Sequence, residues 1–280
     1  MIIGLDHVVI LLDDLAAGIA TYRTLFAREP AWRSTADGAA MAVFTLGNVS
    51  VELMAPDGHG SAAERIRAVL PESGASLASI FFRTDDIARM HRRLERVALK
   101  PEPVAAVEST DIDTGAVLSW KRTRAATDLT RGVRQFFLEL AGERPLSVPA
   151  GEAPFLGLDH IVVATHDPER AAALYGARLG LDLALDRSHP DWGQLMFFRC
   201  GDLIVEVVKR PNDHGDVHRD VLWGMTWRVA DIEAARKRLK AAHVDVSDIR
   251  NGRKPGTRVA SLRDGTLGIP TLLIERTERD

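Results

Sequence analysis

The heptapeptide GLDHVVI at residues 4–10 returns almost unchanged as GLDHIVV at residues 157–163. Two further pairs of blocks follow in the same order: SVEL (50–53) with IVEV (204–207), and PDGHG (56–60) with PNDHG (211–215). Three matched blocks in one order indicate that the chain is a duplication. Each half opens with a histidine in a β-rich run, which predicts that this histidine lies on a strand.

The composition is typical of a globular protein. The 280 residues are 46% hydrophobic and 27% charged, and the length suits two domains of ordinary size. The net charge of −3 does not predict binding to nucleic acid, because such proteins usually carry a basic patch. The single cysteine, Cys200, excludes an intramolecular disulfide and a cysteine-based zinc site. With no signal-like segment at the N-terminus and no apolar run of about 18 residues, we expect a cytoplasmic protein without a membrane partner.

Each half contains a second unit of the same kind, so the sequence predicts four units. In every unit an aspartate follows an equivalent strand position by seven residues, where it can accept hydrogen bonds from the free N–H groups of a first helical turn. These aspartates are Asp14, Asp86, Asp167 and Asp231. Apolar residues at helical spacing then predict helices over residues 15–27, 87–98, 168–179 and 232–242.

About three short β-rich runs follow each helix, so that each unit is predicted to be a βαβββ element. The clearest runs are 41–46, 49–54, 117–121, 135–140, 194–199, 203–208, 258–262 and 271–275. Residues 141–156 are rich in proline and glycine, which favours an extended connection between the halves. We therefore expect a first domain over residues 1–145, a linker over 146–155 and a second domain over 156–280.

These features together resemble the vicinal oxygen chelate (VOC) superfamily, which includes glyoxalase I, bleomycin-resistance proteins, methylmalonyl-CoA epimerase and extradiol dioxygenases. The resemblance rests on Leu-Asp-His in the first strand of units one and three, the helices that begin at aspartate, and a glutamate in the last strand of every unit. It covers almost the whole chain. It implies an α+β fold in which four βαβββ units pair into two glyoxalase-like domains, each a curved mixed sheet with flanking helices.

The resemblance also implies metal ligands on the first and last strands of each unit. By position these are His7, Glu52 and Glu139 in the first domain, and His160, Glu206 and Glu275 in the second. The second unit of each domain departs from the family pattern, because Ser79 and Gly224 stand where another histidine or glutamine is expected. One imidazole and two carboxylates can still hold Zn²⁺, Ni²⁺, Mn²⁺ or Fe²⁺, and Glu139 or Glu275 would act as the base.

Two kinds of function remain open at this point. A glyoxalase-like lyase or isomerase would act on a small α-oxygenated carbonyl compound, with a metal-stabilised enediolate and proton transfer by glutamate. A metal-free binding protein, as among the bleomycin-resistance relatives, would sequester its ligand, and the missing second histidine favours this alternative. The histidine and glutamate that recur together in both halves are explained by metal coordination, so the enzyme is the first expectation and the binding protein the alternative. Extradiol dioxygenase chemistry is less favoured, because it needs a histidine where Gly224 stands.

Four further residues are candidates for contact with a substrate. Ser79 and Gly224 are small, so we expect open space beside them. His59 and His214 match each other in the repeated loops, although Pro-x-x-His-Gly is also typical of an inherited turn. No glycine-rich phosphate loop is present, so no nucleotide cofactor is expected. Paired units within one chain suit a monomer as well as a homodimer.

Overall fold

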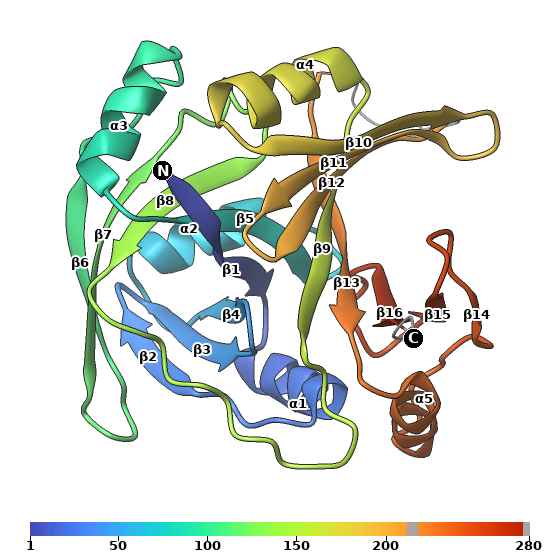
Figure 1. Ribbon diagram of the computed structural model, residues 1–280. Helices are drawn as coiled ribbons and strands as arrows, with labels where there is room; N and C mark the ends of the chain where they lie inside the picture. The colour runs from blue at the N-terminus through green and yellow to red at the C-terminus, as the bar shows by residue number, and fades with distance from the viewer. Residues whose placement is uncertain (212–217, 277–280) are drawn as a thin grey trace.

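The structure is a computed structural model that describes residues 1–211 and 218–276. It contains two eight-stranded mixed sheets, one from each half of the chain (Figure 1). The strand order of the first sheet is β2-β3-β4-β1-β5-β8-β7-β6, and the second sheet repeats it as β10-β11-β12-β9-β13-β16-β15-β14. The predicted α+β class and the pairing of βαβββ units are confirmed.

The strands of the first sheet are β1 (Ile2–Leu12), β2 (Trp32–Ala36), β3 (Ala39–Thr45), β4 (Ser50–Pro56), β5 (Ala75–Thr84), β6 (Ala105–Thr110), β7 (Val117–Arg124) and β8 (Arg134–Leu140). Those of the second are β9 (Gly157–Ala164), β10 (Asp182–His189), β11 (Gly193–Cys200), β12 (Leu203–Lys209), β13 (Val221–Arg228), β14 (Arg250–Asn251), β15 (Thr257–Leu262) and β16 (Thr271–Arg276). In both sheets the first strands of the two units pair antiparallel at the centre, and each pairs parallel with the last strand of its own unit.

Four helices begin where the aspartates predict, and each aspartate accepts a hydrogen bond from a first-turn N–H group. They are α1 (Leu15–Phe26), α3 (Ile87–Arg96), α4 (Pro168–Ala172) and α5 (Ile232–Ala241). A π-helical segment, η1 (Ala173–Arg178), continues α4. A fifth helix, α2 (Ser61–Val69), was not expected; it follows the first PDGHG loop directly.

The two faces of each sheet have different neighbours, because side chains alternate along a strand. One face, here called the helix face, packs against α1, α3, α4 and α5 in a core that is continuous between the halves. The opposite face carries His7 in the first sheet and His160 in the second, and is here called the histidine face. Its buried apolar cluster includes Val9, Phe81 and Leu138 in the first sheet, where α2 adds Ile66. In the second sheet the cluster is smaller.

Side chains of each half form hydrogen bonds with backbone groups of the other half. Asn48 accepts a hydrogen bond from the Leu158 N–H group and donates to the Leu158 carbonyl, both at 2.8 Å. The Arg93 guanidinium donates to the carbonyls of Ala177 and Arg178, and that of Arg178 donates to the end of α3 in return. The two sheets are therefore held in one packed body.

The connection between the halves is extended, as expected, but it is packed against the first half. The Thr45 N–H group donates to Ser147 Oγ at 2.9 Å, and Phe155 is fully buried between Phe26 and Trp227. We retain residues 1–145 and 156–280 as the proposed domains, joined by 146–155. Within the described residues no helix is long and apolar enough to cross a membrane.

Candidate functional site

A β-bulge in the first strand of each half places an aspartate beside the histidine. In the pairing of β1 with β5, Leu5 is opposite Phe82 and His7 is opposite Phe81, so Asp6 is an extra residue. Leu5 and Val8 both face the helix-face core, which leaves Asp6 and His7 together on the other face. Bulges re-aim side chains in this way. The second half repeats the bulge at Asp159.

In the first half, His7 lies between two carboxylates. Its Nδ1 is 2.7 Å from Asp6 Oδ1, and its Nε2 is 3.2 Å from Glu52 Oε2. The Arg144 Nε–H group donates to Asp6 Oδ1 at 2.8 Å. The imidazole stacks on Phe81 with the ring centroids 3.9 Å apart, so the ring is held on its edges and on one face.

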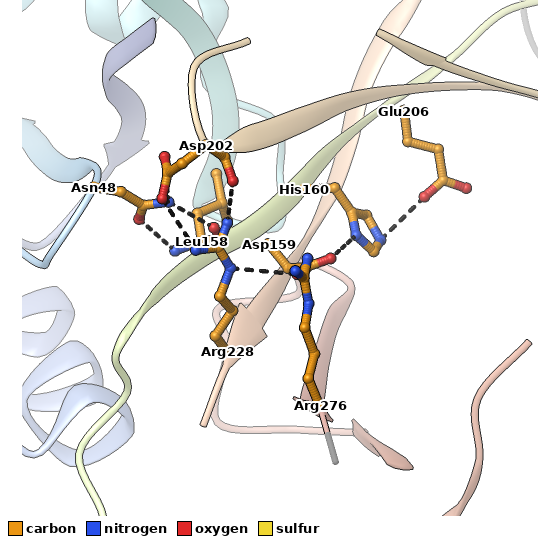
Figure 2. Close-up of polar contacts among 8 residues, drawn as sticks. All are labelled: Asn48, Leu158, Asp159, His160, Asp202, Glu206, Arg228 and Arg276. Carbon is orange, nitrogen blue, oxygen red and sulfur yellow. Dashed lines mark hydrogen bonds and ion pairs between the residues drawn. The ribbon is translucent and has the colours of Figure 1, made fainter. Parts of the chain in front are cut away.

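The second half has the same arrangement (Figure 2). His160 Nδ1 is 3.0 Å from Asp159 Oδ2, and His160 Nε2 is 3.0 Å from Glu206 Oε2. Here two arginines hold the aspartate, because Arg228 Nε and an Arg276 terminal nitrogen both donate to Asp159 Oδ1. The expected pairs His7–Glu52 and His160–Glu206 are thus brought together, each with an aspartate that orients the ring.

Three carboxyl groups of these sites have a lowered pKa. Burial alone would raise the pKa of Asp6, but the contacts with His7 and Arg144 outweigh it and lower the pKa to about 2. The pKa of Asp159 is lowered in the same way, by contacts with His160 and Arg276 that outweigh burial. Burial likewise opposes a lowered pKa at Glu52, where the contact with His7 and the nearby arginines prevail. All three carboxylates are therefore negatively charged at neutral pH.

The two sites differ in exposure. The His7 side chain is 4% exposed, whereas that of His160 is 18% exposed. In the first half α2 lies on the histidine face, where Ile66 packs with Val9, Leu11 and Phe81. The described part of the second half has no helix on this face. Of the two imidazoles, that of the second half is therefore the more exposed.

The last-strand glutamates do not join these sites. Glu139 Oε2 accepts a hydrogen bond from the Ile87 N–H group at 2.8 Å, at the start of α3. Glu275 does the same at the start of α5, where its Oε1 is 3.4 Å from the Ile232 nitrogen, and its Oε2 also accepts from Arg258 Nε at 2.5 Å. Both carboxylates lie on the helix face. This placement argues against the predicted roles of Glu139 and Glu275 as metal ligand and base.

Strand register identifies the positions that are truly equivalent to Glu52 and Glu206. Glu52 is opposite Val9, two residues after His7, and Glu206 is opposite Val162, two residues after His160. In the second unit of each half, the corresponding first-strand residues are Phe81 and Thr226, two residues after Ser79 and Gly224. Phe81 is opposite Phe136, and Thr226 is opposite Leu272. Neither Phe136 nor Leu272 can coordinate a metal.

The donor set is therefore two groups on each histidine face, one imidazole nitrogen and one carboxylate. Catalytic metal sites generally use three protein ligands, and no group of three or more histidine, cysteine, aspartate or glutamate side chains suited to a metal occurs within residues 1–211 and 218–276. The residues present thus do not fit a resident catalytic metal ion of the kind that the superfamily resemblance implies.

The remaining predicted residues have mixed outcomes. Ser79 is 6% exposed and lies on the histidine face, beside Val9. A side chain at Gly224 would place its Cβ 2.5 Å from the Pro270 carbonyl oxygen, so the expected open space is wrong. His59 is exposed in the loop before α2, with no described contact to His7. His214 lies outside the described residues.

Comparison with known families and structures agrees with this architecture. Residues 5–155 match the glyoxalase-like domain family, and residues 157–265 match the glyoxalase/bleomycin resistance protein/dioxygenase superfamily. A search of curated proteins finds no match.

Solved structures with the same fold include enzymes of different activities. A mutant of 4-hydroxymandelate synthase from Streptomyces coelicolor is 13% identical with a TM-score of 0.71, covering 100% of this chain and 95% of that one. The Mn(II)-bound glyoxalase from Novosphingobium aromaticivorans is 14% identical with a TM-score of 0.67, covering 99% and 83%. A halotolerant catechol dioxygenase is also 14% identical, with a TM-score of 0.61 and coverage of 100% and 89%. At these identities the likeness concerns the fold.

Proposed function

Because the chain belongs to the vicinal oxygen chelate superfamily, with two glyoxalase-family domains in tandem, we propose that it binds a small molecule on the histidine face of the second half, without a resident metal ion. The observation that carries this proposal is the register of the last strands. Phe136 and Leu272 occupy the positions where the further metal donors would stand. The chain therefore keeps the fold of the superfamily but has fewer potential metal ligands than the family pattern implies.

The second histidine face offers both apolar and polar contacts for a ligand. Val162, Leu195 and Val208 form a small buried cluster there, with Phe197 packed against it. The planes of the His160 and Phe197 rings are 20° apart, with centroids 6.5 Å apart. Ligand sites are generally apolar surfaces with a few fixed polar groups, and the rigid group of Asp159, His160 and Glu206 is such a polar element.

The polar group is pre-organised for recognition. Asp159 is fixed by two arginines, so the imidazole has little rotational freedom and Nε2 keeps one direction. A ligand hydroxyl that replaces the contact between His160 Nε2 and Glu206 would meet one nitrogen and one carboxylate oxygen, to which it can donate. Pre-organisation of this kind increases affinity because little ordering entropy is lost on binding.

A metal-dependent lyase or isomerase acting on a small α-oxygenated carbonyl compound is the second candidate. One observation favours it: an aspartate holds Nδ1 of each histidine and leaves Nε2 toward a glutamate, as the outer-shell partners of metal-bound histidines do. A divalent ion held by His160 and Glu206 would supply polarisation of two neighbouring substrate oxygens. An extradiol-type dioxygenase has less support, because neither Gly224 nor Leu272 can supply the further ligand that would be needed beside His160 and Glu206.

Metal binding separates the two candidates. The purified protein is stripped with chelator, reloaded in turn with Mn²⁺, Fe²⁺, Ni²⁺ and Zn²⁺, dialysed and analysed for bound metal, with His160→Ala as the test variant and His59→Ala as the control. We expect no metal to remain above background in any of the three proteins. About one equivalent that is lost only in His160→Ala would refute the proposal and support the enzyme.

Ligand binding then tests the proposal directly. A library of small carbonyl and hydroxyl compounds is screened in the presence of chelator, by the shift in thermal midpoint that a ligand of the native state produces. We expect ligands whose effect is lost in His160→Ala and Phe197→Ala but kept in His59→Ala. A complete absence of ligands that depend on His160 would contradict binding at this face.

A further inference from the structure

Three arginines gather on the histidine face of the first sheet. Arg122 and Arg124 lie two and four residues after Trp120 on β7, so they share its face of the sheet, and Trp120 packs in the histidine-face cluster. Arg134 lies two residues before Phe136 on β8 and therefore on the same face, and Phe136 belongs to the same cluster. Because β7 pairs with β8, with Arg124 opposite Phe136, the three cationic side chains project from neighbouring strands to the same side.

Two of these arginines form no ion pair with a carboxylate within the described residues. Arg122 and Arg134 are half-buried, and neither has a described hydrogen bond or ion pair with residues 1–211 or 218–276. Burial lowers the pKa of both guanidinium groups. At Arg122 the charges of Glu52 and Glu102 oppose this shift, whereas at Arg134 the charges of Arg124 and Arg219 add to it. Arg124 itself is paired with Glu102. Buried charges are usually paired, so a cluster with more guanidinium groups than carboxylates lacks an anion.

An aromatic surface joins the arginines to the imidazole. The guanidinium carbons of Arg122 and Arg124 are 5.5 and 5.7 Å from the centroid of Phe136. Phe136 stacks on Phe81 with centroids 4.2 Å apart and planes 2° apart, and Phe81 stacks in turn on His7. Because the rings cover one another's faces, a flat apolar group would meet the edges of this stack, with cationic groups at the Phe136 end.

Two buried donors on the same face have no acceptor. Trp120 Nε1 and Arg124 Nε are both buried and make no hydrogen bond in the described part of the chain. An unpaired buried donor costs about 1–3 kcal/mol, so native structures rarely keep one without a purpose. An anionic oxygen acceptor placed among the arginines would satisfy such donors.

We propose that Arg122, Arg124 and Arg134 form a binding site for the oxyanion of a small ligand whose flat apolar part lies against Phe136. Guanidinium groups recognise carboxylates and phosphates through paired N–H donors, and the aromatic surface favours an arylcarboxylate over a free phosphate. The site is in the first half and does not rest on the function proposed for the second half. It gives the half with the covered histidine a ligand of its own.

Calorimetric titration of the full chain at low ionic strength tests the site, with benzoate and inorganic phosphate as separate probes. We expect benzoate to bind, and the affinity to fall at least about tenfold in Arg122→Gln and in Arg134→Gln, as expected for loss of a charge-assisted hydrogen bond. Arg187→Gln, at an exposed position on β10, should bind as the wild type does. Binding of phosphate alone would keep the oxyanion site and reject the aryl part.

Stability measurements separate a ligand site from a structural role. Because Arg122 has no described hydrogen bond or ion pair, and its described contact is with the Phe136 ring, Arg122→Gln should change the thermal midpoint little in the absence of anion. Benzoate should raise the midpoint of the wild type and of Arg187→Gln more than that of Arg122→Gln. Arg122→Lys, which keeps the charge but not the paired donors, should bind with intermediate affinity. No binding of either anion by the wild type, equal binding by both glutamine variants, or a midpoint several degrees lower in Arg122→Gln without anion would overturn the proposal.

Discussion

Substitution of Asp6 by asparagine should destabilise the protein strongly at neutral pH and much less in acid. The side chain is 3% exposed and contacts both His7 and Arg144. The difference between its ordinary pKa of 3.8 and the folded value of about 2 corresponds to about 2 kcal/mol, at about 1.36 kcal/mol per pKa unit. Asp6→Asn should lower the free energy of unfolding by about this amount at pH 7.

The sign of the pH dependence follows from the lowered pKa. A carboxyl group that is more acidic in the folded state contributes its stabilisation above its unfolded pKa and loses it as the pH falls toward the folded value. The full contribution of Asp6 should therefore be present at pH 5 and should fall to about half at pH 3. The difference between wild type and Asp6→Asn should shrink over the same range.

Urea denaturation, followed by tryptophan fluorescence at pH 7, 5 and 3, measures this difference. With a slope of about 3 kcal/mol per molar urea, the midpoint of Asp6→Asn should lie roughly 0.7 M below that of the wild type at pH 7. Asp248→Asn is the matched control, because Asp248 also pairs with an arginine but is 99% exposed, and such pairs contribute little. Equal losses in the two variants, or a loss at Asp6 that is independent of pH, would refute this reasoning.

Three further outcomes follow from single contacts. Glu139→Gln should lower stability by about 1 kcal/mol through the start of α3 and leave ligand and metal titrations unchanged; a change in either titration would restore Glu139 to the site. Gly224→Ala should cost about 2 kcal/mol in chemical denaturation, because its Cβ would lie 2.5 Å from a carbonyl oxygen, whereas Gly4→Ala, with nothing within 4 Å, should be nearly neutral. Asn48→Ala should lower the thermal midpoint, because it leaves the Leu158 N–H and carbonyl groups without their partner; an unchanged midpoint would show that the other contacts between the halves suffice.

The two halves have diverged on one face while keeping the same framework. Both retain the bulged Asp-His pair and the glutamate opposite it. In the first half α2 and the arginines of β7 and β8 surround a nearly buried imidazole. In the second half the imidazole is more exposed. Duplication therefore left two similar polar groups in different surroundings, which is why we assign them different ligands.

The sequence alone determined the four repeated units and the order of strand and helix within them. Local signals were sufficient for this, because an aspartate that caps a helix and an alternating β-rich run are both short-range features. The repeated Leu-Asp-His and the matching Glu52 and Glu206 also identified the pairs that the structure brings together. The sequence did not reveal α2.

Only the tertiary structure decided which last-strand residue faces the histidine. Glu139 and Glu275 were chosen as the glutamates of their strands, but the register places Phe136 and Leu272, each three residues earlier, at the equivalent positions. Because side chains alternate with a period of two, an odd displacement moves a residue to the opposite face. The same holds for the arginines, since strand pairing between distant segments, rather than their order in the chain, brings them beside Phe136.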